Sequence, residues 1–80
     1  MNLSNTLIKA RLTSGNLAVY EVQPQHLNLL HYTGMTLGEV ARMYGRQVAH
    51  ELNGQWCRVG FWAPLEDPKL LKLIDQMAEA

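Results

Sequence analysis

The sequence predicts an α+β domain: a small three-stranded antiparallel sheet, made of a hairpin and one later strand, with a long central helix and a C-terminal helix packed on one face. Three observations support this prediction. Apolar and polar residues alternate near the start of the chain, a capping box precedes an apolar stripe in the middle, and an N-capped amphipathic segment lies near the end. Eighty residues suffice for one small domain, which we expect to span residues 1–80.

The first predicted element is a β-hairpin. In the run IKARLT, which starts at position 8, apolar and polar residues alternate with the period of a half-exposed strand. Gly15 can take the positive φ that a short loop needs, and a β-branched and aromatic run follows from Leu17 to Val22. The sequence does not decide which face of this second strand points to the core, because either Val19 or Tyr20 can lie on that face.

Two helices are predicted after the hairpin. Pro24 suits the first turn of a short helix through PQHLNLLHY, which ends before Gly34. A long helix then starts at the capping box formed by Thr36 and Glu39. Its apolar stripe runs in steps of three and four from position 37 to position 52, and Asn53-Gly54 supplies the left-handed residues favoured at a helix end.

The stretch TLGEVARMYG also resembles a helix-turn-helix motif. Ala41 and Gly45 have the spacing of the alanine and the turn glycine in that motif. The motif requires apolar side chains one, six and nine positions after the glycine, and those positions hold Arg46, Glu51 and Gly54. We therefore expect one continuous helix, in which Gly45 costs about 1 kcal/mol as an interior residue.

The last two elements are a strand and a helix. The run QWCRVGFWA is rich in aromatic and strand-favouring residues. Its odd positions, together with one face of the hairpin, are predicted to form the core side of the sheet: Ile8, Ala10, Leu12, Cys57, Val59 and Phe61. Asp67 is a candidate N-cap for a C-terminal helix that starts at Pro68 and carries an apolar stripe of Leu70, Leu71, Ile74 and Met77.

The composition excludes several classes of protein. Apolar residues make up 48% and charged residues 18%, as in folded domains rather than disordered chains. Seven basic residues balance seven acidic ones, so the chain lacks the long-range positive field of a basic nucleic-acid-binding domain. No apolar run is long enough to span a bilayer, and the first residues lack the pattern of a secretory signal. We expect a soluble, cytoplasmic protein.

No pattern of residues predicts catalysis or metal binding. Cys57 cannot form an intramolecular disulfide, which favours a reducing compartment, and a domain this small often gains stability as a homodimer. A Cys57 nucleophile activated by His50 is conceivable, yet the parity of Cys57 points it into the core, where cysteine behaves as a small hydrophobic residue. The histidines form no metal-ligand spacing with one another or with Cys57. We predict no enzyme, no cofactor and no metal site.

The remaining candidate is the side of the sheet that the helices leave open. We name it the aromatic-basic face, and its predicted residues are Lys9, Arg11, Tyr20, Trp56, Arg58 and Trp62. Tryptophan, tyrosine and arginine carry much of the binding energy in protein interfaces. The alternative is that one or both tryptophans complete the core, or that the final helix crosses over them. Arg42 and Arg46, one turn apart on the predicted long helix, form a secondary polar surface.

These observations predict a small non-catalytic protein-interaction module of the inhibitor or adaptor type, with a protein partner bound on the aromatic-basic face. In its size, neutral charge and lack of catalytic motifs, the chain resembles small proteins of phages and mobile elements, such as anti-CRISPR proteins. The alternative is a nucleic-acid-binding or transcriptional regulatory protein. It would stack bases on the aromatic-basic face or use a degenerate helix-turn-helix at residues 24–53.

Overall fold

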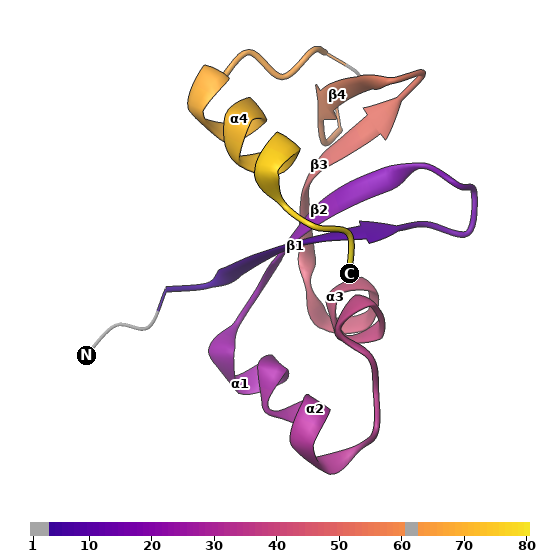
Figure 1. The fold of residues 1–80 in the computed structure, drawn as a ribbon, viewed down its shortest axis with the longest axis vertical. Coiled ribbons are helices and arrows are strands. Elements are labelled where there is room, and N and C mark those ends of the chain that lie inside the picture. The colour runs from indigo at the N-terminus through magenta and orange to yellow at the C-terminus, as the bar shows by residue number, and fades with distance from the viewer. Residues whose placement is uncertain (1–3, 61–62) are drawn as a thin grey trace.

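A computed structural model describes residues 4–60 and 63–80 of the chain. The elements follow in the order β1 (Thr6–Arg11), β2 (Leu17–Val22), α1 (Pro24–Leu27), α2 (Leu29–Tyr32), α3 (Leu37–Tyr44), β3 (Arg46–Leu52), β4 (Gln55–Arg58) and α4 (Pro68–Gln76). The described strands form one four-stranded antiparallel sheet in the order β1-β2-β3-β4 (Figure 1). The α+β class is correct, but the prediction of three strands is wrong.

The predicted long central helix is also wrong. Helix α3 ends at Tyr44, and the chain continues as β3 through the residues that were expected to complete the helix. Gly45 lies between the two elements in an extended conformation, with φ −79° and ψ 163°. Asn53 and Gly54 both have positive φ values, 52° and 80°, which is the geometry of a tight hairpin turn rather than of a helix end. Residues 46–52, where the second helix of a helix-turn-helix would lie, are therefore a strand.

Helices cover both faces of the sheet, which corrects the prediction that they pack on one. Helices α1 to α3 lie on one side of β1 and β2, and α4 lies on the other (Figure 1). The core on the α3 side consists of Ile8, Ala10, Ala18, Tyr20, Val22, Val40 and Ala41. The core on the α4 side centres on Val19, Ala49 and Ile74, with Leu7, Val48, Trp56, Leu65, Leu70 and Met77 packed around them.

The local signals at the hairpin and at the helix starts are confirmed. β1 and β2 pair as a hairpin, and its loop holds Gly15 at φ 94°. The Thr36 hydroxyl accepts from the Glu39 amide, and the Glu39 carboxylate accepts from the Thr36 amide, so the capping box starts α3. The Asp67 carboxylate accepts from two backbone amides in the first turn of α4.

A β-bulge sets the register between β2 and β3. Val19 pairs with Ala49 while Tyr20 pairs with Gln47, so Val48 is an extra residue on β3. Without this extra residue Gln47 would lie opposite Glu21. With it, Arg46 takes that place, and the guanidinium of Arg46 binds the Glu21 carboxylate at 2.9 Å.

Both outer strands of the sheet form hydrogen bonds with other segments of the same chain. At β1, the Ala80 amide donates to the carbonyl of Lys9 at 2.7 Å. At β4, residues 63–65 run alongside, where the Arg58 amide donates to Ala63 and the Leu65 amide donates to Trp56. The middle of each outer strand is thus already paired.

Candidate functional site

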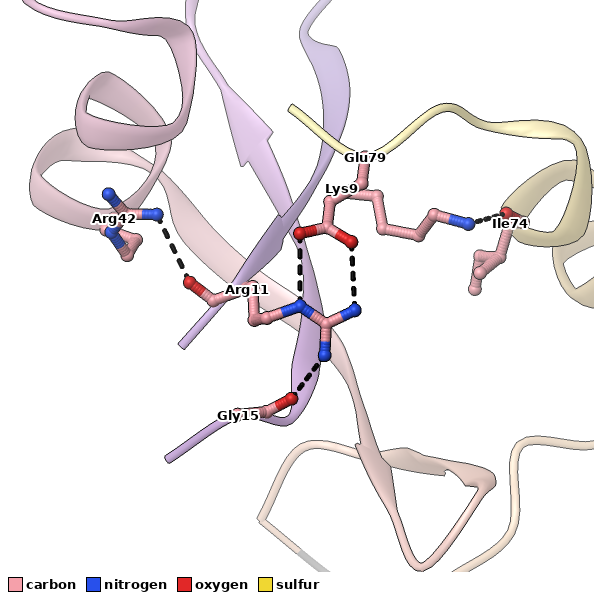
Figure 2. A network of polar contacts seen from close by, with 6 residues as sticks. All are labelled: Lys9, Arg11, Gly15, Arg42, Ile74 and Glu79. Atoms are coloured by element: carbon pink, nitrogen blue, oxygen red, sulfur yellow. Dashed lines mark hydrogen bonds and ion pairs between the residues drawn. The ribbon is translucent and has the colours of Figure 1, made fainter. Parts of the chain in front are cut away.

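The structure places Lys9 and Arg11 against the C-terminal segment. The Arg11 guanidinium binds the Glu79 carboxylate through two hydrogen bonds of 2.9 and 3.1 Å, and it also donates to the Gly15 carbonyl. The Lys9 ammonium donates to the carbonyl of Ile74 at 2.9 Å (Figure 2). Both cations of β1 therefore bind the end of α4 and the residues after it, although the Arg11 side chain remains about half exposed.

Helix α4 covers the middle of the predicted aromatic-basic face. Ile74 is fully buried against Val19 and Ala49, and Trp56 is half-buried beside this cluster. The expectation of an uncovered face is therefore wrong for this central part. Trp62, the second predicted tryptophan, lies outside the described residues, as does Phe61.

Two further predicted residues belong to the opposite side of the sheet. Tyr20 is buried in the core under α3. Arg42 extends from α3 to the edge of the sheet, where its guanidinium donates to the Arg11 carbonyl at 3.2 Å (Figure 2). Arg42 and Arg46 do not share a helix face, because Arg46 begins β3.

A hollow lies beside β3 and the end of β4. We call it the arginine hollow; it measures about 560 Å³, opens to solvent and is lined by Arg46, Gln47, Val48, Arg58 and Val59. The Arg46 side chain is 76% exposed and Val59 is 40% exposed, against the prediction that Val59 points into the core. The hollow thus combines two cationic groups from neighbouring strands with two valines.

The bulge determines the position of Arg46, one of the two cations of the hollow. The extra residue Val48 lines the hollow and turns Arg46 toward Glu21, on the α4 side of the sheet. The hydrogen bond from Arg46 holds the pKa of Glu21 below its ordinary value, so this carboxylate stays ionised at neutral pH. Arg46 has five N–H donors, of which one binds Glu21, and its side chain as a whole stays largely exposed.

The contact between Arg11 and Glu79 predicts a pH dependence of stability. Its hydrogen bonds lower the pKa of Glu79 in the folded chain. A lowered pKa stabilises the fold above the unfolded-state pKa of glutamate, and this stabilisation is lost as the pH falls through the folded-state value. The free energy of unfolding should therefore decrease with falling pH in the acidic range, and less steeply in Glu79→Gln. Urea denaturation across that range, repeated with added salt to screen the exposed pair, measures the effect.

The same titration with Arg11→Gln provides the reciprocal test. Both variants break one contact, so they should remove the same part of the pH dependence. A wild-type acid slope in both variants would contradict a role for this ion pair.

His50 and Cys57 lie opposite each other in the β3–β4 hairpin, so their side chains share one face of the sheet. Cys57 is only 3% exposed, and its thiol lies 3.7 Å from the Gln55 carbonyl that accepts from it. Such burial is typical of a structural cysteine. Within residues 4–60 and 63–80, no three histidine, cysteine or acidic side chains converge as metal ligands. No helix in the same part of the chain has the length and apolar character needed to cross a membrane.

Both arginines of the hollow were predicted from the sequence as binding residues, whereas its other lining residues were not. Gln47, Val48 and Val59 carry no motif, and they meet only because residues 46–52 form a strand with a bulge. The Asn53-Gly54 pair is the signal that could have located this strand.

Comparison with family models, with curated proteins and with solved structures found no match for this chain.

Proposed function

We propose that this chain is a small non-catalytic protein-interaction module that binds its partner at the arginine hollow. The observation that carries the proposal is that Arg46, Arg58 and two valines line one hollow that opens to solvent. Arginine is enriched in protein interfaces because it combines several donors with an apolar stem. An inhibitor or adaptor, of the kind encoded by phages and mobile elements, would act by occupying or bridging a partner's surface in the cytoplasm.

The predicted aromatic-basic face contributes its outer part to this proposal. Arg58 belongs to both surfaces, and the half-buried Trp56 precedes it by two residues on β4. Because residues 63–65 already pair with β4, a partner would contact side chains here rather than add a strand. Side-chain recognition suits a chain with no net charge, since affinity then depends on local complementarity and not on a long-range field.

Charge reversal at the hollow tests the proposal. We expect Arg58→Glu to keep the fold, because Arg58 is exposed, and to lose a partner that the wild-type chain captures from cells of its source. The captured protein is identified, purified and titrated against both chains by calorimetry. We expect the affinity to fall by at least about tenfold, since reversing a charge replaces attraction with repulsion.

Lys72→Glu is the matched control, because it makes the same charge change on the exposed side of α4. It should bind the purified partner as the wild-type chain does. Equal affinities of wild type and Arg58→Glu would contradict the proposal.

A further inference from the structure

We propose that the arginine hollow recognises a carboxylate side chain flanked by aliphatic residues in a segment of a partner protein. This inference rests on the proposed function and specifies the chemistry of the partner. In addition, Glu21 of the same chain lowers the affinity of the hollow for this carboxylate, because it neutralises the charge of Arg46.

The contact between Arg46 and Glu21 indicates which group the hollow binds. A guanidinium matches a carboxylate in charge and in the geometry of its donors. Here Arg46 already holds one carboxylate oxygen at 2.9 Å, while its side chain stays largely exposed. Arg58, on the neighbouring strand, also lines this hollow and adds a second positive charge to it. A ligand carboxylate in the hollow would be attracted by both charges.

The valines indicate what lies beside that carboxylate. Val48 and Val59 line the same hollow as the two cations, and a solvated phosphate would gain nothing from them. An aliphatic side chain would remove their apolar surface from water. This favours a peptide segment with alternating acidic and aliphatic character over a nucleic-acid backbone, which in addition would meet a chain with no net positive charge.

Glu21 gives the inference a signed test. Its carboxylate competes with the ligand for Arg46 and repels the incoming charge. Glu21→Gln removes that negative charge while keeping the shape of the side chain. The affinity for an acidic segment should therefore increase in this variant, whereas removing either arginine should decrease it.

The experiment is an amide NMR titration with an acetylated and amidated hexapeptide of alternating valine and glutamate. We expect saturable shifts at Val48, Arg58 and Val59 in the wild-type chain. Glu21→Gln should lower the Kd by about two- to fivefold, and Arg46→Gln or Arg58→Gln should raise it by a similar factor, as for exposed charge pairs. The matched control peptide has glutamine in place of each glutamate and should bind more weakly than the acidic one.

Three results would overturn the inference: no shifts at the hollow, equal binding of the two peptides, or tighter binding of a short oligothymidylate than of the acidic peptide. An unchanged or higher Kd in Glu21→Gln would overturn the role of Glu21. Each of these differs from failure of the proposed function, which is a cellular partner whose affinity does not depend on Arg58. If a cellular partner requires Arg58 but the acidic peptide does not bind, the proposed function is retained and only recognition of a carboxylate is contradicted.

Discussion

Ile74→Ala is expected to lower the free energy of unfolding by about 3 kcal/mol, in the range for truncation of a buried aliphatic side chain. Ile74 is the only residue within α4 that is fully buried, and it packs against Val19 and Ala49. Truncation leaves a cavity between the helix and the sheet. Chemical denaturation followed by circular dichroism gives the change in stability.

The neighbouring position supplies the control for this substitution. Leu73 lies on the same helix but is 45% exposed, so Leu73→Ala should change stability by no more than about 0.5 kcal/mol. Hydrogen exchange should also show faster opening of α4 in Ile74→Ala, since that side chain anchors the helix to the sheet. Equal stabilities of the two variants would show that α4 is not held by its buried contact.

Gly45→Ala is expected to destabilise the fold by about 2 kcal/mol, through crowding rather than backbone strain. An alanine adopts the φ of −79° and ψ of 163° seen at Gly45 without difficulty. A Cβ atom there, however, would lie 2.5 Å from the Ala41 carbonyl oxygen and 3.0 Å from atoms of Tyr20 and Val22. The carbonyl belongs to the last turn of α3, so either the helix end or the start of β3 must move. Thermal and urea unfolding measure the loss.

Gly38→Ala, in the first turn of α3, gives the opposite expectation. The nearest atom to a Cβ at Gly38 is the Nη1 of the flexible Arg42 side chain at 3.2 Å, so only the exposed hydrogen bond from this nitrogen to the Arg11 carbonyl has to adjust. Alanine at this helical position should leave stability unchanged or raise it by up to about 1 kcal/mol. A Gly45→Ala chain as stable as Gly38→Ala would show that the junction of α3 and β3 has room that the structure does not.

The sequence predicted elements well where a local signal decides the backbone. The capping box at Thr36 and the N-cap at Asp67 each satisfy backbone donors within a few residues, so they require no tertiary contact. The first hairpin has a regular alternation and a glycine in its loop. In these places local preference and tertiary structure agree.

The prediction was wrong for residues 45–54, where the sequence is compatible with both a helix and a strand. The apolar positions Val48 and Leu52 continue a helical stripe, and the bulge at Val48 removes the alternation that would otherwise mark a strand. Asn53-Gly54 suits a helix end and a hairpin turn equally well. The strand forms because it pairs with β2 and β4, which is a tertiary effect.

The candidate site could be predicted only in part for the same reason. Arg46 and Arg58 were named, but their proximity depends on a strand and a one-residue shift of register. The partners of Lys9 and Arg11 lie about sixty-five positions away along the chain, at Ile74 and Glu79. No local pattern indicates on which side of the sheet α4 packs.

The pairing of both outer strands with their own chain has a consequence for behaviour at high concentration. Fibril growth and domain swapping start when exposed strand edges of separate molecules align. Here such alignment would first have to break the bonds of Ala80 to β1 and of residues 63–65 to β4. A partner bound at the proposed hollow would thus meet arginine and valine side chains, while the bonded backbone groups of β1 and β4 stay engaged within the chain.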